Sequence, residues 1–221
     1  SLISGATAAY ASIQSTYWMS FAVVGGFSSV YLLAGGLSNA QIGLFSAICG
    51  MATAVLQPRI GAFADRSQIP LRSFIVSGAG LLALVSALLL LPAGNPLIAV
   101  ITYALLIIGS QTLSPLIDAL GMAAISWGCN VNYGVARGLG SVSYGLISTV
   151  AGYLVAARGE GILPWLFIIL FAALLAAAFS FRLKAGAGSG ADGTDAGRPD
   201  HPPADTVRHN PVKLKVFLLG M

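Results

Sequence analysis

Long apolar segments alternate with short polar breaks along the first 181 residues of the chain. Each segment holds at most one charged residue. At 1.5 Å per residue, each is also long enough to cross the ~30 Å hydrocarbon core of a bilayer. The pattern predicts six membrane-spanning helices, at residues 8–34, 40–64, 73–91, 97–125, 134–156 and 162–181.

The pattern changes after Lys184. Residues 185–211 are rich in Gly, Ala, Asp, Pro and His, a composition that buries too little apolar surface to fold alone. They are predicted to form a disordered cytoplasmic linker. Residues 212–221 become apolar again and are predicted to begin a seventh membrane helix. We therefore expect residues 1–184 to be the N-terminal six-helix bundle of a transporter built from two such bundles. A complete six-span protein is the alternative.

Composition supports a membrane protein and excludes several other classes. Of 221 residues, 57% are hydrophobic and only 8% are charged, whereas soluble domains carry roughly 25% charged residues. A soluble enzyme, a nuclease and a disulfide-stabilised scaffold are excluded, so no enzymatic activity and no nucleic-acid partner are expected. The two cysteines are predicted to be free thiols, and both histidines lie in the linker. No metal site and no cofactor are expected.

Basic residues in the short loops predict the orientation in the membrane. Positively charged loops remain on the cytoplasmic side. Basic residues gather between the second and third segments and after the sixth, whereas the opposite side has only Arg158; the cytoplasmic set is Arg59, Arg66, Arg72, Arg182 and Lys184. The protein is therefore expected in the cell membrane, with its N-terminus and the 185–211 linker in the cytoplasm.

Two charged residues lie inside predicted spans, where no topology rule requires them. Asp118 lies in the fourth span and Arg137 in the fifth. Each charge costs about 2.5 to 3.5 kcal/mol on insertion scales. If the two antiparallel helices meet near residues 126–130, both charges lie at similar depth. The pair is then either part of a solute site near the midplane or a structural clasp between the two spans.

An aromatic residue follows Arg137 on the same helical face. Tyr144 is seven residues, or two turns, further along. An aromatic ring beside an arginine and a carboxylate suits a sugar-like solute, because the ring stacks on CH groups while the charged groups bind hydroxyls. The sequence therefore favours Asp118, Arg137 and Tyr144 as substrate-binding residues.

The connection between the second and third spans resembles a signature of the major facilitator superfamily. The matching residues are Gly61, Asp65, Arg66 and the later Arg72. The resemblance implies a conformational gating motif, in which Asp65 helps to hold the two halves of the transporter together. It also implies an all-α membrane fold, in which a six-transmembrane-helix bundle, a 3+3 inverted repeat, forms the N-terminal half of a twelve-helix transporter.

Spans four and five resemble the lactose-permease-like branch, which contains oligosaccharide/proton symporters and nucleoside permeases. The matching residues are Pro115, Asp118, Gly134, Arg137, Gly140 and Tyr144. Lactose permease has Glu and Trp where this chain has Asp118 and Tyr144. In this branch the first span lines the cavity, so the resemblance implies Tyr17 and Phe21 as further substrate-binding residues.

Together these features predict a secondary active transporter. It would import a small hydroxylated solute, a sugar or a nucleoside, by proton symport with alternating access. The expected partners are that solute, protons, the lipid bilayer and a C-terminal half of the same transporter. Two alternatives remain. One is a non-transporting scaffold with an Asp118–Arg137 clasp. The other is a drug/proton efflux antiporter, which the absence of proline in the fifth span disfavours.

Overall fold

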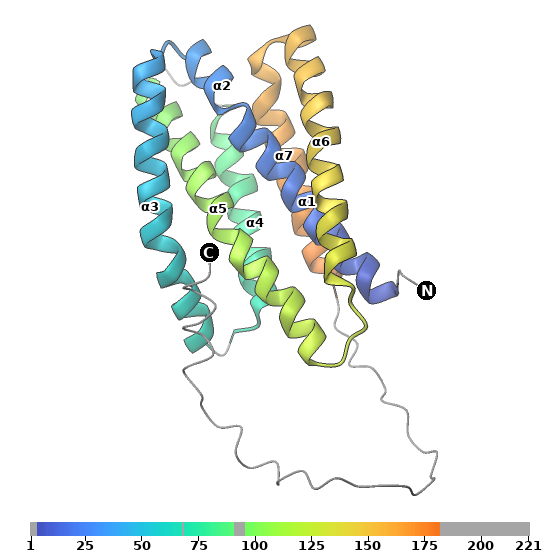
Figure 1. The fold of residues 1–221 in the computed structure, drawn as a ribbon. Coiled ribbons are helices and arrows are strands. Elements are labelled where there is room, and N and C mark those ends of the chain that lie inside the picture. Colours follow the sequence, from blue (N-terminus) through green and yellow to red (C-terminus); the bar gives the residue numbers. More distant parts are fainter. Residues whose placement is uncertain (1–3, 68, 91–95, 182–221) are drawn as a thin grey trace, which may run out of the picture. The chain divides into compact units, whose positions relative to one another are not determined.

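The computed structural model describes residues 4–67, 69–90 and 96–181, and these residues are helical throughout apart from short connections (Figure 1). All of them belong to one structural unit, Ser1–Gly186. The helices are α1 (Gly5–Gly26), α2 (Ser28–Ala34), α3 (Asn39–Arg66), α4 (Leu71–Leu88), α5 (Pro96–Ser126), α6 (Tyr133–Arg158) and α7 (Leu163–Ser180), with a 3₁₀ turn η1 (Glu160–Ile162) before α7. The all-α fold class is confirmed for this part of the chain.

Five of the described helices, α3 to α7, are long and apolar enough to cross a membrane. The α1–α2 pair supplies a sixth span if the two helices are counted as one, although they are bent by 40°. The bend lies at Phe27, directly after Gly25 and Gly26, and paired glycines favour such bends because they hold a helix weakly. The six predicted segments therefore correspond to the observed helices, but the bend inside residues 8–34 was not predicted.

Polar side chains mark where several helices begin. Ser4, Ser38 and Asn132 each precede a helix and accept a hydrogen bond from a backbone N–H three residues later. These caps satisfy N–H groups that have no partner inside the helix. At the other end of α6, Gly159 has φ 79°, a conformation that stops the helix and suits glycine.

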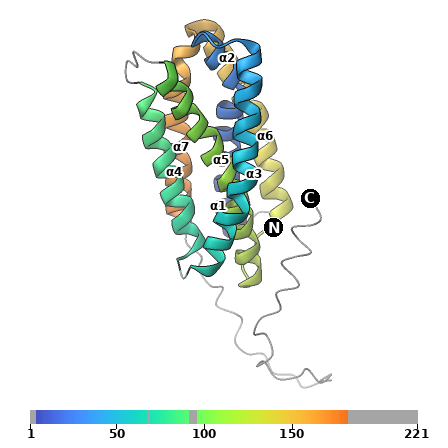
Figure 2. The same cartoon turned by 90° about the vertical axis from the view of Figure 1, so that its left-hand side faces the viewer.

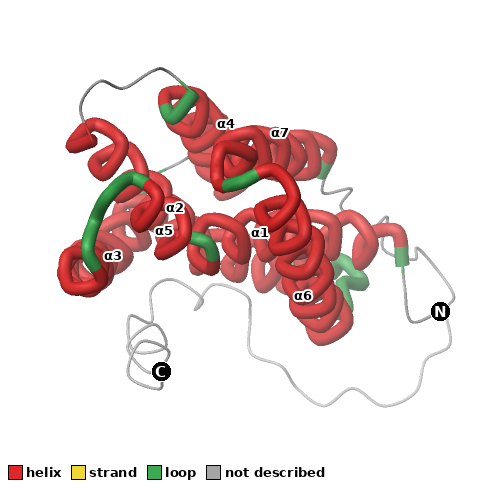
Figure 3. Tube along the Cα trace, turned by 90° about the horizontal axis from the view of Figure 1, so that it is seen from above, coloured by secondary structure: helices red, strands yellow, loops and turns green. Residues whose placement is uncertain are grey.

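Helix α1 lies among α5, α6 and α7 and contacts all three. Figure 3, which looks down on the helices, shows α1 between α5 and α6. Helix α4 packs against α5 and α7, and α3 packs against α5, as the side view also shows (Figure 2). Buried aromatic residues fill the contacts near the α1–α2 bend. Tyr103 stacks on Tyr31 and donates its hydroxyl to the Val24 carbonyl at 2.7 Å.

A proline interrupts the hydrogen bonding of α5. Pro115 has no N–H, so the Gln111 carbonyl one turn earlier loses its helical donor. The Gln57 amide of α3 donates to this carbonyl, with Nε2 2.9 Å from the oxygen. One residue earlier, the Ser110 carbonyl accepts the Tyr17 hydroxyl of α1 at 3.2 Å. Side chains of two neighbouring helices thus support the backbone where α5 is weakest, as a membrane helix requires.

Some predictions fall on residues that the structure leaves undescribed. The 185–211 linker, the seventh span at 212–221 and the basic residues Arg182 and Lys184 all lie outside the described residues. These predictions, and the boundary of the bundle at residue 184, stay predictions.

Candidate solute-binding site

Asp118 is half-buried on α5 and is held by side chains from two other helices. Its Oδ1 atom accepts one hydrogen bond from Gln14 Nε2 of α1, at 3.0 Å, and another from the Tyr133 hydroxyl of α6, also at 3.0 Å. Within the described part of the chain, its second oxygen, Oδ2, accepts no hydrogen bond. Asp118 is therefore oriented by two neutral donors and keeps acceptor capacity for another group.

Gln14 forms hydrogen bonds to three of the side chains in this cluster. Its side chain is 1% exposed and uses both ends of the amide. Nε2 donates to the Tyr10 hydroxyl at 2.8 Å as well as to Asp118, and Oε1 accepts from the Trp18 indole N–H at 3.0 Å. The amide therefore fixes three other side chains at once, and its own orientation is determined by them.

Arg137 of α6 is half-buried, and its guanidinium lies over the Trp18 ring, with Cζ 4.1 Å from the ring centroid. This is the geometry of a cation–π contact. Among the residues that the structure describes, no ion pair joins Arg137 to Asp118, and the guanidinium also interacts with the Tyr133 hydroxyl. The two charges thus lie in one cluster of α1, α5 and α6 side chains, where Tyr133 contacts both of them without a direct ion pair between them.

The two charges differ in their distance from the α5–α6 connection. Asp118 precedes the end of α5 by eight residues, or about 12 Å along the helix, whereas Arg137 follows the start of α6 by four, or about 6 Å. The connection covers residues 127–132, slightly later than the sequence indicates. The long arginine side chain and Tyr133 bridge this offset, so the cluster lies toward that end of the bundle.

The three predicted aromatic residues surround Trp18. The ring centroids of Tyr17, Phe21 and Tyr144 lie 5.4, 5.5 and 6.3 Å from that of Trp18. Tyr17 is 2% exposed and its hydroxyl is donated to a carbonyl of α5, whereas Phe21 and Tyr144 are half-buried. Trp18 itself, like Gln14, was not among the predicted site residues. Their spacing of four residues, which places both on one face of α1, was the available signal.

Comparison with protein families now adds to this geometry. Residues 10–208, most of the chain, match the model of the MFS_1 like family. The chain belongs to this family of the major facilitator superfamily. Comparison with curated proteins and with solved structures gives no match. Membership points to a transporter rather than an enzyme and, with the apolar helices, to a multi-pass membrane protein.

The superfamily signature lies at the junction of α3 and α4. Gly61, Asp65 and Arg66 lie in the last turns of α3, where Asp65 and Arg66 are exposed. A Cβ atom added at Gly61 would meet no atom within 4 Å, so the described residues do not require a glycine there. No ion pair involving Asp65 is formed among the described residues. Its predicted gating role stays a prediction.

Arg72, the last residue of the signature, connects α4 to the end of α7. Its Nε donates to the Ala178 carbonyl at 2.9 Å, its Nη2 donates to the Phe179 carbonyl, and its guanidinium lies over the Phe179 ring. The last carbonyls of a helix have no partner within it and carry partial negative charge. Arg72 therefore caps α7 from a neighbouring helix.

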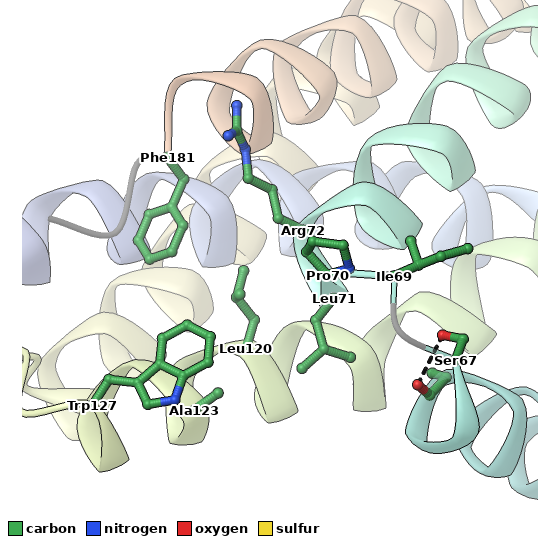
Figure 4. A pocket seen from close by; sticks show the side chains of 10 residues that line it. Ser67, Ile69, Pro70, Leu71, Arg72, Leu120, Ala123, Trp127 and Phe181 are labelled. Carbon is green, nitrogen blue, oxygen red and sulfur yellow. Dashed lines mark hydrogen bonds between the residues drawn. The ribbon is translucent and has the colours of Figure 1, made fainter. Parts of the chain in front are cut away.

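A cavity of about 400 Å³ lies near this cap. Figure 4 shows Ser67, Trp127 and Phe181 on its wall, with the Arg72 side chain directed toward α7. The lining is mainly apolar and includes neither Asp118 nor Arg137. Among the lining residues that the structure describes, Arg72 alone is charged, and it is engaged by α7 carbonyls. The Asp118–Arg137 cluster is therefore the better candidate for a polar solute.

Proposed function

We propose that this member of the MFS_1 like family is a secondary active transporter of the lactose-permease-like branch. It imports a small hydroxylated solute, a sugar or a nucleoside, by proton symport with alternating access. Asp118 and Arg137 bind the solute hydroxyls, and Tyr144, Tyr17 and Phe21 contribute to the aromatic wall around them.

The observation that carries this proposal is the separation of the two charges. A structural clasp would pair Asp118 with Arg137, because an unpaired charge inside a membrane is costly. Instead, neutral donors hold the carboxylate, and the guanidinium lies against the Trp18 ring and interacts with the neutral Tyr133 hydroxyl. Both groups keep hydrogen-bonding capacity that a hydroxylated solute would use, since a carboxylate accepts from hydroxyls and a guanidinium donates to them.

The helix contacts support a bundle built from two related halves of three spans each. The first half is α1 with α2, then α3 and α4; the second is α5, α6 and α7. If the two halves are related, α1 corresponds to α5, α3 to α6 and α4 to α7. The α1–α6 contact then corresponds to the α5–α3 contact, and the α1–α7 contact to the α5–α4 contact. All four contacts are present, as an inverted repeat would require. On this basis we propose that the bundle is the N-terminal half of a twelve-helix transporter.

The Arg72 cap supports a gating role for the α3–α4 junction. Arg72 joins the start of α4 to the end of α7, so a movement of either helix would break its hydrogen bonds. We assign Gly61, Asp65, Arg66 and Arg72 to conformational gating. By the distribution of basic residues, this end of the bundle faces the cytoplasm of a protein in the cell membrane.

Uptake by cells that produce the protein tests the proposal. Labelled sugars and nucleosides are offered, and accumulation is expected for at least one of them. Asp118→Asn, which keeps the shape and hydrogen-bonding oxygen but removes the charge, should abolish that accumulation, as should Arg137→Gln. Glu160→Gln is the matched control, because Glu160 is an exposed acid in the turn before α7. A protonophore should abolish accumulation if protons drive it.

The alternatives predict different results. A clasp predicts that the double exchange of Asp118→Arg with Arg137→Asp restores activity lost in the single variants, whereas a solute site predicts that it stays inactive. An efflux antiporter predicts drug resistance without solute accumulation. A protein that accumulates no sugar and no nucleoside would contradict the proposed import function.

A further inference from the structure

Trp18 connects both charged residues of the proposed site. Its indole N–H donates to Gln14, whose amide in turn donates to Asp118, and its ring face contacts the guanidinium of Arg137. Tyr144, the aromatic residue that the sequence favours, contacts this arrangement through Trp18, at a ring separation of 6.3 Å. Tyr133 bonds to Asp118 directly through its hydroxyl, but Trp18 is the aromatic side chain whose ring face contacts the guanidinium.

The orientation of the Trp18 ring is fixed from several sides. The Gln14 bond holds the pyrrole edge, and Tyr17 and Phe21 contact the ring nearly edge-on, at interplanar angles of 78° and 79°. On α6, Gly140 leaves room for the ring, since a Cβ atom there would lie 2.7 Å from Trp18 Cδ1. A ring held in this way is preorganised, so binding a ligand to it costs little conformational entropy.

We propose that Trp18 determines the specificity of this site for cyclic solutes. In this proposal, which rests on the proposed function, the indole face that Arg137 covers receives the apolar face of a pyranose or a nucleobase. The guanidinium moves from the indole to the solute hydroxyls, exchanging a cation–π contact for charge-assisted hydrogen bonds. An open-chain polyol has no flat face to stack, and it gains only the hydrogen bonds.

Tryptophan fluorescence tests this proposal, because the chain has only three tryptophans. The double substitution Trp127→Phe with Trp165→Phe leaves Trp18 as the sole emitter. Two further variants that keep only Trp127 or only Trp165 are the matched controls, and both of these residues are exposed, at 62% and 54%. Methyl β-D-galactopyranoside and uridine are the cyclic probes, and galactitol is the open-chain probe.

The protein with Trp18 alone should show a saturable change in emission with a cyclic probe that it transports. The two control proteins lack Trp18 and should show none even at roughly tenfold higher probe concentration, which compensates for the weaker binding. In uptake, Trp18→Ala should weaken apparent affinity for that probe by roughly tenfold, as expected when one stacking contact is lost. The inhibition of that uptake by galactitol should change little in Trp18→Ala. Trp18→Phe keeps an aromatic ring but loses the hydrogen bond to Gln14, so its apparent affinity for the cyclic probe should lie between those of wild type and Trp18→Ala. This variant distinguishes a lost stacking contact from a protein that fails to fold.

The results separate the two proposals. If the wild-type protein takes up neither cyclic probe nor any other sugar or nucleoside, the proposed function fails and this inference fails with it. If uptake occurs but Trp18 emission is unchanged, only the role of Trp18 is refuted. Equal losses of affinity for cyclic and open-chain probes in Trp18→Ala would likewise show that Trp18 does not select for rings.

Discussion

Replacing Gln57 with leucine should destabilise the bundle at the Pro115 break. The Gln57 amide supplies the hydrogen bond that the Gln111 carbonyl loses because Pro115 has no N–H. Leucine has similar size and greater hydrophobicity, so packing is largely kept while the donor is lost. The carbonyl is then left without a donor from α3 in a region where water is scarce.

The size of the effect follows from the geometry. The bond is 2.9 Å long and half-buried. Hydrogen bonds of this kind contribute about 1 kcal/mol in proteins, and those between membrane helices average about 0.6 and reach about 1.7 kcal/mol. We expect Gln57→Leu to lower the free energy of unfolding by about 1 kcal/mol. For a chain of this length, that lowers the melting temperature by roughly 2 to 4 °C.

A second substitution isolates the proposed cause. In Pro115→Ala, the new N–H can bond to the Gln111 carbonyl within α5, so the loss of Gln57 should cost almost nothing there. Thermal unfolding of the four purified proteins, followed by far-ultraviolet circular dichroism in one detergent, gives the double-mutant cycle. A coupling energy of about 1 kcal/mol is expected. Equal destabilisation by Gln57→Leu in both backgrounds would refute the assignment of Gln57 as the partner of the freed carbonyl.

Two further substitutions test the packing and capping contacts. Gly140→Ala should lower the free energy of unfolding by about 1 to 3 kcal/mol, because the added methyl group would meet the fixed Trp18 ring. Gly138→Ala is the control, because a Cβ atom there would meet no atom within 4 Å. It should be neutral or slightly stabilising in the same unfolding assay. Arg72→Leu should speed amide hydrogen exchange in the last turn of α7, because two terminal carbonyls lose their donor. Arg66→Leu is the control, because Arg66 is exposed, and it should leave that exchange unchanged.

The spans could be predicted because apolar length alone determines them. A bilayer admits only backbone that satisfies its own hydrogen bonds, so an uncharged segment of about 20 residues must be helical. The bend at Phe27 could not be predicted in this way. It lies within a continuous apolar segment, and the glycines before it are also common in unbent membrane helices.

The candidate site was only partly predictable. Asp118 and Arg137 stand out in the sequence because charges are rare inside spans, and the structure places both in one cluster. Their partners Gln14, Tyr133 and Trp18 carry no formal charge, and neutral polar residues are common enough in membrane helices to give no comparable signal. Which donor meets which acceptor depends on the rotation and crossing of helices, and the pattern along one helix does not determine these.

The position of α1 explains how solute binding and helix movement could be linked in the proposed transporter. Three α1 side chains donate to α5: Tyr10 to the Ile117 carbonyl, Gln14 to Asp118, and Tyr17 to the Ser110 carbonyl beside the Pro115 break. The α1 helix also carries Trp18, which contacts Arg137 of α6. In the proposed inverted repeat, α1 and α5 are counterparts, so the candidate site would lie where these paired helices meet. A solute that draws Arg137 from Trp18 would therefore act on the helix that also supports the break in α5. In alternating access, this arrangement would let occupancy of the site change the balance between two packings of α1 against α5.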